Sequence, residues 1–102
     1  MTKRGAFPRM ATELLITMKE KYITRYEATK GQSYTFVGWR LCITRKGERF
    51  VRYFSDLHYG GSQQAHDAAI LMRDEMMRRM EQGVENYHEF FNMYRRLGRV
   101  EL

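Results

Sequence analysis

The chain has 102 residues, with 18 Lys or Arg against 12 Asp or Glu, and its formal net charge is +6. This length suits one domain with a modest core, and an apolar fraction of 43% argues against a disordered polybasic tail. The single cysteine, Cys42, excludes a disulfide-stapled fold, and no cysteine cluster accompanies the histidines to suggest a zinc finger. The basic balance favours polyanions as partners, with nucleic acid ahead of a membrane.

We expect a cytoplasmic protein without a membrane partner, because no apolar run approaches the length of a membrane span and the charged N-terminal region resembles no signal peptide. We expect no cofactor and no metal. His58 and His66, with Asp67 beside them, could mimic a metal site, but the ligand spacing and a third ligand are missing. No nucleophile lies near a basic partner in a catalytic pattern, so an enzyme is not expected.

Residues 1–21 are expected to be a basic N-terminal arm or a short helix, and the pattern does not decide between the two. Three strands follow. Residues 22–29 are rich in β-branched and aromatic types. Within residues 34–44, the apolar Trp39, Leu41 and Ile43 alternate with Arg40, Cys42 and Thr44, and residues 49–55 form a third strand after a turn at 45–48. Short turns between such segments predict an antiparallel meander.

After a loop expected over 56–61, the apolar period changes from two residues to that of a helix. Ser62 is a candidate N-cap, and Gly83 suits the end of the helix. One helical face carries Ala65, Ala68, Ala69, Met72, Met76 and Met80. A second helix is expected over 84–97, either closing the core or forming a homodimer or partner contact. The fold class is therefore α+β, a three-stranded antiparallel sheet packed on one main helix with an additional C-terminal helix.

The net charge is concentrated on the predicted sheet. Residues 19–52 carry nine Lys or Arg against three Glu, whereas residues 53–102 carry six against eight Asp or Glu. The predicted helix covers one face of the sheet, and nothing in the sequence is expected to cover the other. A small sheet that exposes arginines can enter the major groove of DNA, where arginine reads guanine in a bidentate manner.

A set of residues in this region carries a more specific signal. It consists of Trp39–Gly47, Phe54-Ser55-Asp56, Tyr59-Gly60-Gly61, Ala65 with Ala68-Ala69, and Arg73-Asp74-Glu75. The set resembles the bacterial and phage branch of the Apetala-two family, the ethylene-response-factor type of DNA-binding domain. The resemblance covers roughly residues 22–80 and implies a domain at 22–82, with 83–102 as a C-terminal helix outside it.

In that family the sheet lies in the major groove and the helix supports it from behind. Carried over by position, the resemblance implies that base contacts come from all three strands, through Arg25, Tyr26, Arg40, Cys42, Thr44, Phe50 and Arg52. The expectation for the third strand assumes that Val51 points inward. Phosphate contacts are expected from Lys3, Arg4, Lys30, Arg45, Lys46 and Arg49 in the arm and the turns. This chain has Cys42 and Thr44 where plant members carry more arginine.

The sequence thus predicts a non-enzymatic, sequence-preferring protein that binds double-stranded DNA. It would be a transcriptional regulator or an accessory factor of a phage or mobile element. One alternative in the same class is a detached arm-site-binding domain of a recombinase. Another, from a different class, is a phage inhibitor or adaptor that binds proteins through its Met- and aromatic-rich helices.

Overall fold

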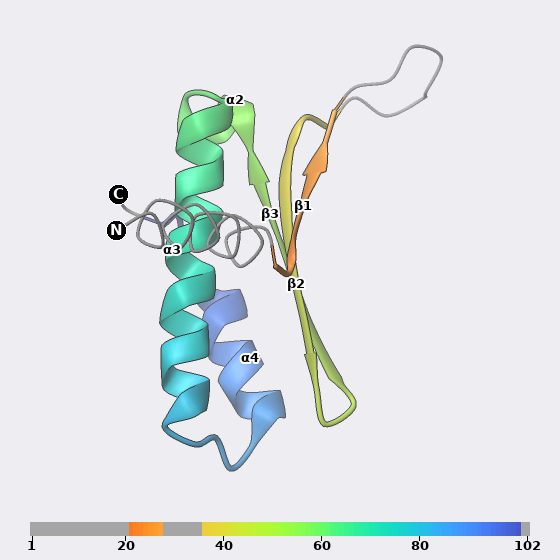
Figure 1. Cartoon of the computed structure of the whole chain (residues 1–102), viewed down its shortest axis with the longest axis vertical. Helices are drawn as coiled ribbons and strands as arrows, with labels where there is room; N and C mark the ends of the chain where they lie inside the picture. Colours follow the sequence, from red (N-terminus) through yellow and green to blue (C-terminus); the bar gives the residue numbers. More distant parts are fainter. Residues whose placement is uncertain (1–20, 28–35, 101–102) are drawn as a thin grey trace, which may run out of the picture.

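The sheet and the helices form two layers. The computed structural model describes residues 21–27 and 36–100. Its three strands form one antiparallel sheet in the order β1-β2-β3, and α3 and α4 lie on the same side of it (Figure 1). This arrangement confirms the predicted α+β fold class. The elements are β1 (Ile23–Tyr26), β2 (Gly38–Arg45), β3 (Glu48–Ser55), α2 (Asp56–Tyr59), α3 (Ser62–Glu81) and α4 (Tyr87–Arg96).

A two-residue turn joins β2 to β3, as the sequence predicts. Lys46 has φ 52° and Gly47 has φ 78°, and both residues lie between the paired Arg45 and Glu48. Two successive positive φ angles are typical of the type I′ turn, whose twist matches that of the flanking strands. The turn thereby fixes the register along the whole β2–β3 hairpin.

The core lies between the sheet and the helices. Its fully buried side chains include Leu41 and Ile43 of β2, Phe50 and Phe54 of β3, and Phe91 of α4. Small residues on α3 face them, because alanine lets a helix backbone lie close to a sheet. The alanines are Ala65, Ala68 and Ala69, and none has any exposed surface.

The helix boundaries differ in part from those expected. The segment from Asp56, expected as a loop, forms the short helix α2, which Ser55 caps by accepting a hydrogen bond from the His58 amide (3.3 Å). Gly61 precedes α3, so Ser62 is its first residue and not its N-cap. A capping side chain such as that of Ser55 pairs an amide group that the first turn of a helix leaves unpaired. A helix as short as α2 is therefore difficult to distinguish from a polar loop in the sequence.

The C-terminal helix α4 starts later than expected and closes the core. Asn86 caps it by accepting a hydrogen bond from the Glu89 amide (3.0 Å), so Val84 lies outside it. Phe91 packs against Phe50 of β3, with ring centroids 5.7 Å apart. Of the two expected roles of this helix, core closure is therefore the one observed.

Candidate nucleic-acid interface

The strand register determines which side chains share a face of the sheet. Ile23 pairs with Leu41, and Leu41 pairs in turn with Arg52. Directly paired residues lie on one face, and successive residues alternate. Since Leu41 is fully buried, these three residues lie on the side of the helices. The opposite face, called the outer face here, carries Thr24, Tyr26, Arg40, Cys42, Thr44, Arg49, Val51, Tyr53 and Ser55.

The outer face carries the expected second-strand set. Arg40, Cys42 and Thr44 lie on it together, and Thr44 is exposed. Tyr26 of β1 lies there too, and the guanidinium of Arg40 stands 5.7 Å from the centroid of its ring. Four of the seven residues that the resemblance implies for base contacts thus share one surface.

An aromatic cluster lies at one end of the outer face. The rings of Tyr26, Phe36 and Tyr53 contact one another edge to face, with centroids 5.3 to 6.1 Å apart. Tyr53 keeps 52% of its surface exposed. Edge-to-face contacts hold rings in defined positions. The cluster therefore offers a rigid, partly exposed aromatic surface beside Arg40.

Arg25 does not lie on the outer face, contrary to expectation. It pairs with Trp39 on the helix side and donates two hydrogen bonds to the carboxylate of Asp56 (2.9 and 2.8 Å). Its guanidinium also stands 5.0 Å from the Trp39 ring centroid. The hydrogen bonds to Asp56, ahead of those to Glu27, raise the pKa of Arg25. The outward residues of β1 are Thr24 and Tyr26, because a strand cannot place Arg25 and its neighbours on one face.

Phe50 and Arg52 were also predicted outward, and the register places both on the helix side. Phe50 is fully buried in the core. Arg52 Nη1 donates to the carbonyl oxygens of Tyr94 (3.0 Å) and Leu97 (2.9 Å), and Nη2 donates to that of Gly98. Arg52 thus supplies donors to the carbonyl groups of Leu97 and Gly98 after α4, and it adds a second donor to the Tyr94 carbonyl, which also accepts from the Leu97 amide. Neither side chain is available to read a base from the outer face.

Val51 and Tyr53 face outward from β3 together with Arg49 and Ser55, and neither Val51 nor Tyr53 was predicted to face outward. The missed signal is the spacing of Phe50 and Phe54. Residues four apart share a face of a strand, and two phenylalanines are more apolar than the pair Val51 and Tyr53. Both phenylalanines are indeed fully buried.

Of the residues expected to contact phosphates, some are exposed and others are engaged in contacts within the fold. Lys46 in the turn and Arg49 on the outer face are exposed. Arg45 instead donates to the hydroxyl of Tyr22 (2.9 Å), and this hydrogen bond lowers the pKa of that tyrosine. Three more predicted contacts, Lys3, Arg4 and Lys30, fall outside the described residues, as do all of residues 1–20.

The acidic charge of the three strands lies on one side of the sheet. Glu48 is the one acidic residue within β1, β2 and β3, and it lies on the helix side, where its carboxylate is 3.2 Å from Nδ1 of His88. The outer face carries Arg40 and Arg49 and no carboxylate among the described strands. A face with cations, hydroxyl groups and aromatic rings but no acid suits a polyanion.

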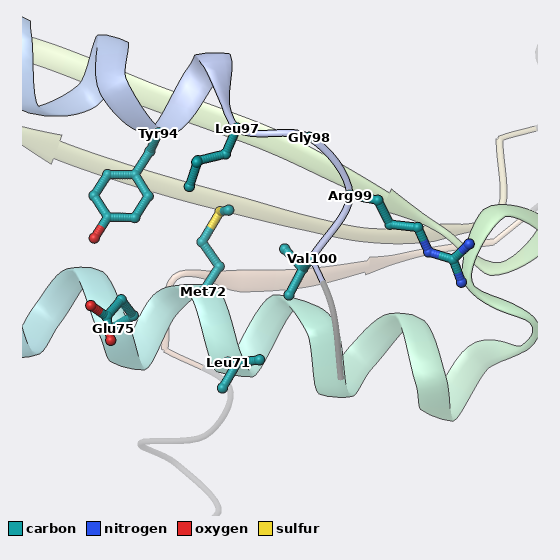
Figure 2. A pocket seen from close by; sticks show the side chains of 8 residues that line it. All are labelled: Leu71, Met72, Glu75, Tyr94, Leu97, Gly98, Arg99 and Val100. Carbon is teal, nitrogen blue, oxygen red and sulfur yellow. The ribbon is translucent and has the colours of Figure 1, made fainter.

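The helical side has an apolar cavity of about 390 Å³ between α3 and the segment that follows α4 (Figure 2). Leu71 and Leu97 border it and keep about half of their surface exposed, at 46% and 50%. Glu75 is the one acidic residue in the described part of its lining, and Met72 and Val100 add to the apolar wall. This cavity lies on α3, the helix that covers the face opposite the outer face.

Comparisons of the chain with family models, with curated proteins and with solved structures return no match. Within residues 21–27 and 36–100, no helix combines the length and apolarity that a membrane span requires. The same residues contain no group of three or more His, Cys, Asp or Glu side chains placed to hold a metal ion.

Proposed function

We propose that this chain is a non-enzymatic, cytoplasmic protein that binds double-stranded DNA by inserting the outer face of its sheet into the major groove. Arg40 and Thr44 would reach base edges, while Lys46 and Arg49 would lie close to phosphates. The role of a regulator or accessory factor of a phage or mobile element is part of the proposal and rests on the family resemblance.

One observation carries the proposal. Glu48, the single acidic residue of the three strands, lies on the helix side, and the outer face combines Arg40, Arg49 and the aromatic cluster without a carboxylate from these strands. Packing requires one covered face but does not require the other face to lack carboxylates. A sheet surface that carries cations and aromatic rings without acids is favourable for binding in a groove.

The proposal is tested by comparing two double variants that remove equal charge from opposite sides. Arg40→Ala with Arg49→Ala alters the outer face, whereas Arg78→Ala with Arg96→Ala removes two exposed arginines from the helices. Two lost arginine contacts at about 1 kcal/mol or more each give at least about a 30-fold loss of duplex affinity. The helix variant is expected to bind nearly as well as the wild type.

Affinity is measured by fluorescence anisotropy with a random-sequence duplex pool and with selected duplexes at two salt concentrations. Thermal unfolding followed by circular dichroism checks that both variants stay folded. Equal losses in the two variants, or no wild-type binding at low salt, would overturn the proposal. Binding that depends steeply on salt but not on sequence would reduce the function to an architectural role.

The adaptor alternative has one observation in its favour, the apolar cavity on the helical side (Figure 2). A protein partner would have to use Leu71 and Leu97, because Phe91 and Tyr94 are buried in the core. A Leu71→Asp variant that keeps full duplex affinity but loses a protein partner would favour this alternative.

A further inference from the structure

A second cavity, of about 310 Å³, lies beside the end of β3, next to the outer face. Phe36 and Tyr53 of the aromatic cluster form one wall of this cavity. His58 and Tyr59 of α2 contribute to the lining, as does Arg99 from the segment that follows α4. Among residues 21–27 and 36–100, no acidic side chain lines it. The cavity thus continues the outer face past the edge of the sheet with further basic and aromatic groups.

Arg99 is held in place at this cavity. Its guanidinium stands 5.0 Å from the centroid of the Tyr59 ring. The residues on either side are tied down, since the Gly98 carbonyl accepts from Arg52 and the Val100 amide donates to the Tyr59 hydroxyl (3.0 Å). Figure 2 shows the Arg99 side chain extending away from the other side chains of the apolar cavity. A side chain fixed in this way loses little entropy when it binds a ligand.

The chemistry of the lining matches a nucleic-acid backbone. A guanidinium that stacks on a ring keeps the N–H groups in its plane for an anion, and phosphate is the anion that arginine binds in a bidentate manner. His58, whose side chain is exposed, can add a second donor. The rings of Phe36 and Tyr53 supply an apolar surface on which a deoxyribose can rest.

We infer that this cavity binds one phosphodiester group of the DNA strand that passes the edge of β3. Arg99 and His58 contact its phosphate, and Tyr53 contacts the adjoining sugar. This inference rests on the proposed function, because two lining residues belong to the aromatic cluster of the outer face. It adds a contact from the segment that follows α4, outside the region of the family resemblance.

The test compares Arg99→Ala with Arg96→Ala, a matched loss of one exposed arginine three residues earlier. We expect Arg99→Ala to weaken binding of every duplex about tenfold, as expected for the loss of one charge-assisted hydrogen-bonded contact. The slope of log K against log salt should also fall by about 1, whereas Arg96→Ala should leave that slope unchanged. Arg99→Lys should keep the slope and lose part of the affinity, since it retains the charge but not the fork.

The outcomes separate the two proposals. If Arg99→Ala and Arg96→Ala alter affinity and slope equally while the wild type binds DNA, the cavity is not a phosphate site and the proposed function stands. If the wild type shows no salt-dependent duplex binding, both are overturned. A second experiment titrates the protein with inorganic phosphate alone and follows the NMR signals of the His58 ring. Saturation by free phosphate without any effect of Arg99→Ala on duplex binding would overturn the assignment to DNA. Unchanged thermal unfolding of the variants shows that the fold is intact.

Discussion

Two charged side chains on the helix side of the sheet stabilise the fold and do not face a ligand. Arg25 joins β1 to α2 through Asp56, and Arg52 joins β3 to the end of α4. Arg25 binds one carboxylate in a bidentate manner and Arg52 donates to three carbonyl groups, so the donors of a guanidinium suit fixed geometry inside a fold as much as they suit guanine. The count of arginines on a strand therefore says nothing of their direction, and only the register separates a structural arginine from one that faces a ligand.

Gly38 lies where the fold leaves no room for the methyl group of an alanine side chain. A Cβ atom there would lie 2.3 Å from the carbonyl oxygen of Phe54 and 2.7 Å from Cζ of Phe36. We expect Gly38→Ala to lower the free energy of unfolding by about 1–3 kcal/mol, because the β3 backbone has to move. Thermal unfolding measures the loss, which corresponds to a fall in Tm of several degrees.

Gly98→Ala is the matched control for this substitution, since a Cβ atom at Gly98 meets nothing within 4 Å. Its unfolding temperature should stay close to that of the wild type. A Gly38→Ala variant as stable as Gly98→Ala would mean that β2 and β3 approach each other less closely than described.

At the scale of elements, the sheet and α4 depend on Arg52. Its guanidinium donates to the carbonyl groups of Tyr94, Leu97 and Gly98, which end the helix. We expect Arg52→Met to destabilise the fold by about 1.5–3 kcal/mol, the usual contribution of hydrogen bonds to a charged group. Hydrogen exchange of the Val100 amide should quicken, because the segment after α4 loses its anchor.

The same variant distinguishes the two orientations of β3. If Arg52 faced outward, Arg52→Met would lose duplex affinity without any loss of stability. With Arg52 on the helix side, stability falls, and at temperatures where the variant is folded its duplex affinity should fall no more than that of Arg99→Ala. Arg96→Ala, which removes an exposed arginine from the same helix, controls for the charge.

At the scale of the whole molecule, the sheet and both long helices share one core. Phe91 of α4 is fully buried and packs against Phe50, and Tyr94 is 3% exposed. Replacing one buried phenylalanine by alanine costs about 3–5 kcal/mol, a large part of the 5–15 kcal/mol that stabilises a typical domain. A region ending at residue 82 would lack Phe91 and Tyr94 and would expose the side of Phe50 that packs against Phe91.

We therefore expect a chain truncated after Gln82 to lose its cooperative thermal transition. The measurement is circular dichroism and calorimetry on the truncated and complete chains at equal concentration. A cooperative transition near the wild-type Tm in the truncated chain would instead establish residues 22–82 as an independent domain, with the C-terminal helix as an addition to it.

Several parts of the fold could be predicted from the sequence because they depend on residues that are close together in the chain. The alternation of Trp39, Leu41 and Ile43 predicts the inward face of β2, and Lys46-Gly47 predicts its turn. The alanine and methionine stripe predicts α3. The outward position of Arg40, Cys42 and Thr44 follows from the same alternation, since neighbours on a strand point to opposite faces.

Other parts depended on tertiary contacts. The phase of β1 is one, because a strand of four residues carries too few apolar positions to mark its face. The inward direction of Arg52 in β3 is another. The spacing of Phe50 and Phe54 favours their face of the strand as the buried one, but that same face carries the charged Arg52. Pairing with the buried Leu41 settles both strands, which places Arg25 and Arg52 inward.

The sequence by itself determined the strand and helix periods and the concentration of positive charge in the first half of the chain. Only the tertiary structure decided how that charge is divided, with Arg40 and Arg49 on the outer face and Arg25 and Arg52 on the face toward the helices. The physical reason is that charge and period are properties of neighbouring residues, whereas the face of a short strand is set by what its partner strand buries.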